Sequence, residues 1–192
     1  MDSKIIKQET TGIKTKELVL TGLMAALICV MGPLSLPIPI SPVPISLATL
    51  AIYFSVYILG MKRSTISCLI YLLIGFVGLP VFSGFTSGPA KLLGPTGGYM
   101  VGYIVLTLVC GAFIDKWRGR LIPCFAGMVF GTLVFYAIGT AWLSVQGHMS
   151  FGSALAAGVL PFIPGDLAKI IVVVLVGPQI CKRLRKAGLN ES

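Results

Sequence analysis

Six long apolar segments divide this sequence, and they restrict its possible folds more than any other feature. Each is close to the roughly 20 residues that a helix needs to cross the hydrocarbon core of a bilayer. They run over Leu18–Leu36, Ile45–Met61, Ser64–Val81, Gly97–Ile114, Leu121–Val145 and Gly165–Cys181. The chain is 56% hydrophobic and only 11% charged, whereas a soluble domain carries roughly 25% charged residues. We therefore predict an all-α integral membrane protein with six transmembrane helices.

The positions of the basic residues predict the orientation of these helices. Of the fifteen Lys and Arg, all but Lys91 and Lys169 lie in the N-terminal tail, the second and fourth connections or the C-terminal tail. Because such residues are enriched on the cytoplasmic side, we expect both termini in the cytoplasm. One membrane domain, 1–192, would then comprise an N-terminal tail (1–16), a six-helix bundle (17–186) and a C-terminal tail (187–192). The placement of the net charge of +9 favours the lipid bilayer as partner and not nucleic acid.

The three remaining connections differ from the basic ones because they are rich in Pro and Gly. They read "GPLSLPIPISPVP", "GLPVFSGFTSGPAKLLGPTGGY" and "QGHMSFGSALAAGVLPFIPGD". Pro and Gly end helices at a membrane surface, and Gly also lets backbone approach a ligand closely. Three such loops on one side favour a shared ligand site that faces outward.

The stretch "LPFIPGDLAK" places an acid and a base at the start of the last apolar segment. Asp166 and Lys169 are three residues apart, so they share one face of a helix. The helix dipole favours a carboxylate in the first turn but not a Lys. A charge costs about 2.5–3.5 kcal/mol at the centre of a membrane helix and less near its ends. Two interpretations stay open: a structural salt bridge, or a polar clamp in which Asp166 accepts ligand N–H groups and Lys169 donates to a ligand oxygen.

Other motifs limit the possible chemistry. "GPTGGY" offers backbone N–H groups before the fourth segment, which suit a carboxylate or a carbonyl. No GxxxxGK[ST] or other ATPase or kinase signature occurs, so transport would need a partner or an ion gradient for its energy. The five scattered Cys and the single His148 show no metal-ligand or catalytic spacing, which indicates no metal, cofactor or catalytic site.

Small residues on the first apolar segment indicate a close helix contact. Gly22 and Ala26 are four residues apart, with Ala25 beside them. This spacing lets the backbones of two helices approach each other, either inside the protein or at a partner subunit.

Several of these segments together resemble the BioY family. The segments are "PVPISLATL", "GLPVFSGFTSG", "GPTGGYMVGY" and "GVLPFIPGDLAK", in order along most of the chain. Members of this family are the biotin-capturing S components of energy-coupling factor (ECF) transporters. The resemblance implies a bundle of six membrane helices in a prokaryotic cell membrane, an outward-facing biotin pocket and no enzymatic activity. It also implies two kinds of partner: a transmembrane T component and two cytoplasmic ATPases.

The resemblance also implies roles for particular residues. The family's acid and base fall on Asp166 and Lys169, and the small-residue face that docks on the T component falls on Gly22, Ala25 and Ala26. Biotin carries a ureido head, an apolar bicycle and a carboxylate tail, which fit the remaining candidates. Polar contacts are expected from Ser83, Thr86, Gly97 and Gly98, and apolar packing from Phe82, Phe85 and Tyr99.

One position departs from the family pattern. Many relatives carry Gln before the second segment, in the position where this chain has Ala48. Without that side chain, part of the ligand is held differently, so a related carboxylate such as lipoate is an alternative. A stand-alone vitamin carrier driven by an ion gradient is a second alternative, although such carriers usually place their ionisable groups near the membrane midplane.

Overall fold

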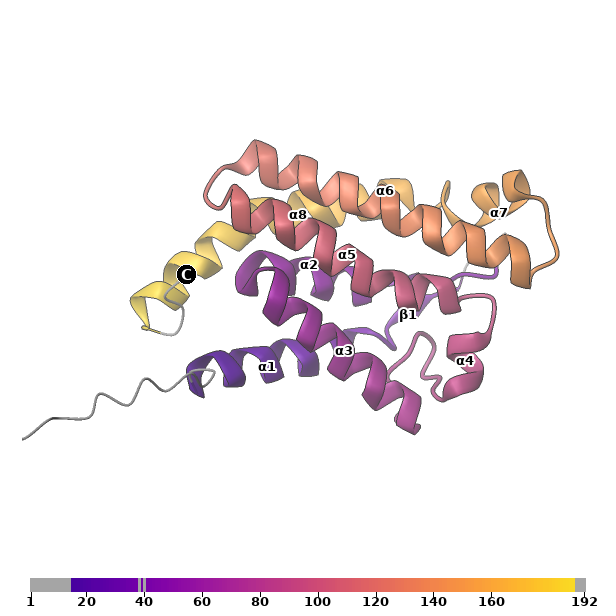
Figure 1. Ribbon diagram of the computed structural model, residues 1–192, viewed down its shortest axis with the longest axis horizontal. Coiled ribbons are helices and arrows are strands. Elements are labelled where there is room, and N and C mark those ends of the chain that lie inside the picture. The colour runs from indigo at the N-terminus through magenta and orange to yellow at the C-terminus, as the bar shows by residue number, and fades with distance from the viewer. Residues whose placement is uncertain (1–14, 38, 40, 189–192) are drawn as a thin grey trace, which may run out of the picture.

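The computed structural model of the chain describes residues 15–37, 39 and 41–188, and helices dominate this part (Figure 1). The elements in chain order are α1 (Thr15–Met31), β1 (Ser35–Leu36), β2 (Ile45–Ser46), α2 (Ala48–Leu59), α3 (Met61–Val77), α4 (Pro89–Leu93), α5 (Gly97–Lys116), α6 (Leu121–Gln146), α7 (Phe151–Gly158) and α8 (Ile163–Lys186). The predicted tail 1–16 lies outside the described residues except for Thr15 and Lys16, as do the last four residues of the predicted tail 187–192.

Each of the six predicted apolar segments overlaps one helix, in order α1, α2, α3, α5, α6 and α8. Of these, α5, α6 and α8 are long and apolar enough to cross a membrane by themselves, and α2 is apolar but shorter. The long helices pack side by side in alternating directions (Figure 1). The number of membrane spans and the cytoplasmic position of the termini remain predictions.

The connections between the helices contain short elements that the sequence analysis did not describe. α1 ends at Met31, before the predicted Leu36, because Gly32 and Pro33 follow. The next residues form a short antiparallel hairpin in which Ser35 pairs with Ser46. α3 ends at Val77 because Gly78 has a φ of 118°, a left-handed value that suits Gly. Two short helices, α4 and α7, occupy the later Pro- and Gly-rich connections.

Helix α2 lies at the centre of the bundle. All of its residues except Leu50 and Phe54 are buried, and it packs against α1, α3, α5 and α8. At 12 residues and about 1.5 Å of rise per residue it is roughly 18 Å long, shorter than the roughly 30 Å hydrocarbon core. Its first turn lies inside the bundle, because Ala48, Thr49 and Ala51 are buried. There the hairpin and the start of α8 contact it.

Glycines allow α5 and α6 to pack closely along their length. A side chain at any of several glycines would collide with an aromatic or sulfur-containing side chain of the other helix. The pairs are Gly127 with Phe113, Gly131 with Cys110, and Gly139 with Tyr99. This is the small-residue packing expected between membrane helices, where close backbone approach replaces the hydrophobic effect.

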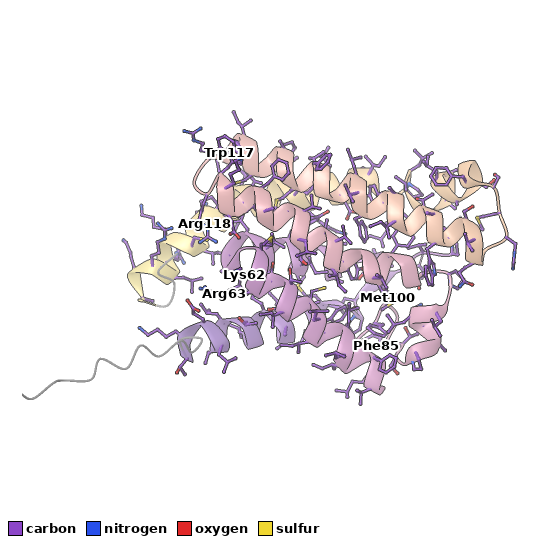
Figure 2. The ribbon with its side chains drawn as sticks, viewed as in Figure 1. Lys62, Arg63, Phe85, Met100, Trp117 and Arg118 are labelled. Carbon is purple, nitrogen blue, oxygen red and sulfur yellow. The ribbon has the colours of Figure 1, made fainter. Side chains whose placement is uncertain are left out.

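The two ends of the bundle differ in chemistry. Lys62, Arg63, Trp117 and Arg118 lie at one end, whereas Phe85 and the Pro- and Gly-rich connections lie at the other (Figures 1 and 2). We call these the basic end and the loop end. Among the charged residues of the basic end, Arg63 forms an ion pair with Glu17 of α1.

Candidate functional site

Asp166 is a buried carboxylate in the first turn of α8. Its exposed fraction is 5%, and its backbone N–H donates to the carbonyl of Phe162 at 2.8 Å. Pro164 fits this first turn because the N–H that it lacks has no partner there in any helix. The N-terminal end of the helix dipole stabilises the negative charge of Asp166.

Side chains from three helices donate hydrogen bonds to this carboxylate. Lys169 Nζ of α8 lies 2.9 Å from Oδ1, and Thr49 Oγ1 of α2 lies 3.3 Å from the same oxygen. Tyr136 OH of α6 lies 2.6 Å from Oδ2. Because both oxygens are bonded, the cost of burying this charge is offset inside the protein.

The ammonium group of Lys169 is also fully bonded. Besides Asp166, it donates to the carbonyl of Ser46 and to Thr49 Oγ1, each at 2.8 Å. An ammonium has three N–H donors, so these contacts use all of them. A ligand that bonds to Lys169 must therefore replace one of the protein acceptors.

The Asp166–Lys169 pair faces a cavity of about 40 Å³. Its aromatic wall consists of Tyr99, Tyr103, Phe135 and Tyr136, in which Tyr103 and Phe135 stack with ring centroids 5.4 Å apart. Val43, Pro44, Gly158 and Phe162 also line it, and they come from connections at the loop end. About 10–15 Å³ of such space holds one water molecule, and ligand pockets typically measure roughly 300–1,000 Å³. The cavity must therefore enlarge to admit any vitamin-sized ligand.

A second cavity, of about 110 Å³, lies between α6 and α8 and is lined mainly by apolar side chains. Asp166 and Tyr136 line both cavities. Their hydrogen bond therefore lies in the wall between the two spaces.

Comparison with known proteins identifies the family. The model of the BioY family matches residues 4–186. The chain belongs to the BioY family.

Individual relatives agree with this membership. A biotin transporter named BioY2 from Lactococcus lactis subsp. cremoris is 36% identical over 171 residues, covering 89% of this chain and 93% of the relative. A biotin transporter named BioY from Thermotoga maritima is 35% identical over 167 residues, covering 87% and 96%. These relatives are transporters, so membership of the BioY family makes this chain a transport protein and not an enzyme.

A solved structure confirms the fold class. It is described as the S-component for biotin from an ECF-type ABC transporter, and it matches with a TM-score of 0.81 at 34% identity. The match covers 90% of this chain and 92% of the other. The chain is therefore a multi-pass helical membrane protein with the fold of an ECF S component, as its resemblance to BioY implied.

Of the ligand-binding residues expected from the BioY resemblance, Asp166, Lys169 and Tyr99 lie together at the first cavity. Tyr99 OH donates to the carbonyl of Gly158 at 2.9 Å, which ties the start of α5 to the end of α7. The neighbouring Gly97 and Gly98 do not line this cavity. They let the start of α5 pack against Leu92 and Trp142, because a side chain at either position would collide there.

The other expected residues lie in the connection between α3 and α4 and do not line the cavity. Phe82 is fully buried and makes an edge-on contact with Tyr71, with ring centroids 5.6 Å apart. Phe85 is 67% exposed, and the Thr86 hydroxyl donates to the carbonyl of Ser83 at 3.0 Å. Any contact of Ser83, Phe85 or Thr86 with a ligand would require this turn to move toward the cavity.

The three expected docking residues on α1 divide between two faces. Gly22 and Ala26 are exposed, and open space surrounds Gly22. Ala25 is 2% exposed and packs into the core. A partner helix can therefore reach Gly22 and Ala26, whereas Ala25 contacts the inside of the protein.

Sequence reasoning missed Thr49, Tyr103, Phe135 and Tyr136. Thr49 lies in the "PVPISLATL" segment, next to Ala48, the position that departs from the family pattern. A phenol within an apolar membrane segment needs a hydrogen-bond partner, and this signal could have selected Tyr136. Within the described part of the chain, no group of His, Cys, Asp or Glu side chains could hold a metal ion.

Proposed function

We propose that this protein captures biotin from outside a prokaryotic cell, with high affinity, as the substrate-binding subunit of an ATP-driven ECF transporter. The observation that carries the proposal is the buried Asp166–Lys169 pair beside an aromatic wall, in a chain whose relatives are named biotin transporters. Burying a charged pair within a membrane protein costs free energy, so such pairs usually have a function. Ligand recognition is the function that fits this pair.

The chemistry of biotin fits this site. The two carboxylate oxygens of Asp166 can accept hydrogen bonds from the two N–H groups of a ureido head, and the ammonium of Lys169 can donate one to a ligand oxygen. The aromatic wall offers apolar surface to the bicycle. On binding, ligand groups would take the places that Thr49 and Ser46 hold on Asp166 and Lys169 in the present structure.

Biotin entry requires the cavity to open on the side of the loop end. Val43 and Pro44 precede β2, and Gly158 and Phe162 flank the connection from α7 to α8. These short segments line the cavity beside the polar pair, so their displacement would enlarge it without separating the long helices. Ligand entry from the outside follows if the loop end faces outward, as the basic connections predict.

Energy for release into the cell would come from partner subunits. The chain has no nucleotide-binding motif, so we assign ATP hydrolysis to two cytoplasmic ATPases that act through a T component. The exposed Gly22 and Ala26 on α1 are the proposed contact with that T component, because small residues allow close helix packing.

The direct test is binding of a ligand panel to the purified protein. We expect isothermal titration with biotin, lipoate and other vitamins to give one tight site for biotin, and mass spectrometry to find biotin co-purified with the protein. Tighter binding of lipoate would show that Ala48 has shifted the specificity. Proton-driven uptake into vesicles without partner subunits would support a stand-alone carrier instead.

A further inference from the structure

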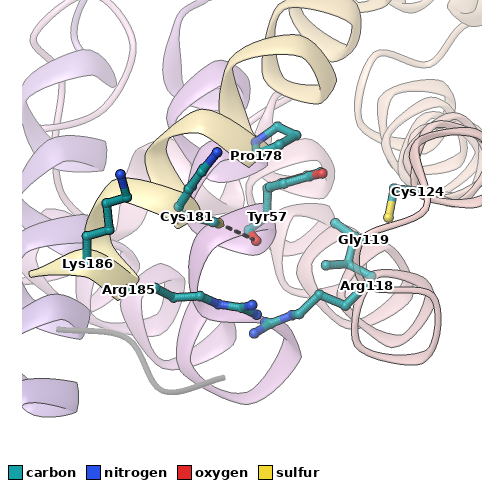
Figure 3. A pocket seen from close by; sticks show the side chains of 10 residues that line it. Tyr57, Arg118, Gly119, Cys124, Pro178, Cys181, Arg185 and Lys186 are labelled. Carbon is teal, nitrogen blue, oxygen red and sulfur yellow. Dashed lines mark hydrogen bonds between the residues drawn. The ribbon is translucent and has the colours of Figure 1, made fainter. Parts of the chain in front are cut away.

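A third cavity, larger than the two beside Asp166, opens at the basic end of the bundle, far from the Asp166–Lys169 pair. Its volume is about 310 Å³, which lies at the lower limit of the roughly 300–1,000 Å³ typical of ligand pockets. It lies between the end of α2, the turn from α5 to α6 and the last turns of α8 (Figure 3). Nothing in the proposed capture of biotin uses this cavity.

The rim of this cavity is strongly cationic. Arg118 comes from the turn between α5 and α6, and α8 contributes Lys182, Arg185 and Lys186. Figure 3 shows the side chains of Arg118 and Arg185 extending toward one another from these two elements. None of the described residues that line the cavity is acidic. The nearby Asp115 lies 3.5 Å from Arg118 but also accepts the N–H of Met61, so it offsets only part of this charge.

The floor of the cavity is apolar. Ile114 and Cys124 contribute from α5 and α6, and Pro178 and Cys181 from α8. Tyr57 closes the deep side, where its carbonyl accepts a hydrogen bond from Cys181 Sγ at 3.8 Å (Figure 3). An occupant that satisfies both parts of the cavity must be an anion with an apolar portion.

The neighbouring residues place the cavity at a membrane surface. Lys116 and Arg120 lie 5.6 and 5.5 Å from the ring centroid of Trp117, in cation–π geometry. Trp and basic side chains at the ends of membrane helices are typical of the headgroup region. Basic pockets between such helices on the cytoplasmic side suit the headgroups of anionic lipids.

We propose that this cavity binds one anionic phospholipid. The phosphate would lie among Arg118, Lys182, Arg185 and Lys186, and the glycerol and first acyl carbons would cover the apolar floor. An acidic protein segment would match the charged rim but has no need of an apolar floor that is continuous with the bilayer. Lipid is therefore the occupant that the observed surface favours.

The test uses the full-length purified protein in detergent and native mass spectrometry. The probes are dioctanoyl phosphatidylglycerol, dioctanoyl phosphatidylcholine and inorganic phosphate. We expect one phosphatidylglycerol to bind in preference to both other probes. In Lys182→Gln/Arg185→Gln its affinity should fall about 30-fold, since each basic residue contributes on the order of 1 kcal/mol at a membrane surface.

A matched control separates a defined site from general attraction. Lys116→Gln/Arg183→Gln removes one Lys and one Arg from the same end, but neither residue lines the cavity, so this variant should keep wild-type affinity. Lys182→Gln/Lys186→Gln leaves Arg185 in place and should still weaken binding. Thermal unfolding of each variant shows that it is folded.

Three results would overturn the proposal. An equal loss in the control variant would mean that only net charge matters. Binding of inorganic phosphate as tight as that of phosphatidylglycerol would identify a free-anion site. If Lys182→Gln/Arg185→Gln bound lipid as well as wild type but no longer assembled with the T component and ATPases, the cavity would be a protein-docking surface.

Discussion

At the scale of single residues, Asp166 connects three helices. It accepts hydrogen bonds from Thr49 of α2, Tyr136 of α6 and Lys169 of α8. A salt bridge that only snorkels to the membrane surface needs none of the contacts from α2 and α6. The hydrogen bonds from α2 and α6 therefore exceed what a charged pair needs to be stable in a membrane. They fix the position of the carboxylate at the cavity wall.

The first prediction concerns the Asp166–Lys169 pair. Asp166→Asn should still insert and fold but bind biotin about 10- to 150-fold more weakly, because each lost charge-assisted hydrogen bond costs about 1.5–3 kcal/mol. Isothermal titration measures the change. Asp166→Leu/Lys169→Met removes both charges, and a folded double mutant that binds biotin as well as wild type would make the pair structural only.

The second prediction concerns Tyr136. Tyr136→Phe keeps the ring but removes the donor to Asp166 Oδ2, so biotin affinity should fall by about tenfold or more. Tyr53→Phe is a matched control, since Tyr53 OH bonds to Thr132 at 2.6 Å and not to Asp166. Equal affinities of both variants for biotin would show that Tyr136 does not orient the carboxylate.

At the scale of helices, glycines have two different uses in this protein. Gly127 of α6 lies against Phe113 of α5, with no room for a side chain. Gly22 of α1 has open space around it. The sequence pattern of small residues is the same in both helices, and only the contact distinguishes internal packing from an exposed face.

The third prediction tests the internal contact. Gly127→Leu should destabilise the protein by about 1–3 kcal/mol or more, because it overpacks the α5–α6 interface. Thermal unfolding in detergent measures the effect. Gly22→Leu is the control and should unfold at the wild-type temperature; equal loss of stability in both variants would contradict the assignment of Gly22 to an open face.

The fourth prediction tests the exposed face. Gly22→Leu should leave biotin binding intact but weaken co-purification with the T component and the ATPases, because a bulky side chain holds helices apart. Gly152→Leu places the same side chain in open space on α7 at the loop end and should not affect assembly. If Gly22→Leu assembled normally, the docking face would not include Gly22.

At the scale of the whole molecule, the bundle has the polar pair near its loop end and the 310 Å³ cavity at its basic end. Among the described basic residues, Lys91 and Lys169 lie away from the basic end. Lys91 lies in α4, and Lys169 belongs to the polar network around Asp166. This separation follows from the alternating direction of the helices. Under the two proposals made above, biotin capture and phospholipid binding take place at opposite ends of the bundle.

The fifth prediction is the orientation of these two ends. Single cysteines at Lys62, Arg118 or Lys186 in a cysteine-free background should react with an impermeant reagent only from the cytoplasm. A cysteine at Met149 should react from outside. Labelling of Arg118→Cys from outside intact cells would contradict the predicted orientation.

The sequence alone predicted what depends on local spacing. Apolar segments of sufficient length became helices, Gly and Pro ended them, and the spacing of Asp166 and Lys169 brought their side chains into contact at 2.9 Å. These features follow from the helical repeat and from the properties of each residue, so neighbours in the chain contain the necessary information.

Only the tertiary structure decided which distant residues complete the site. Thr49 and Tyr136 are 117 and 30 residues away from Asp166, and no periodicity relates them to it. The same holds for Phe82, whose ring contacts Tyr71 in the core instead of the cavity. Contacts of this kind depend on how all the helices fit together at close packing, and a pattern within one segment does not specify that fit.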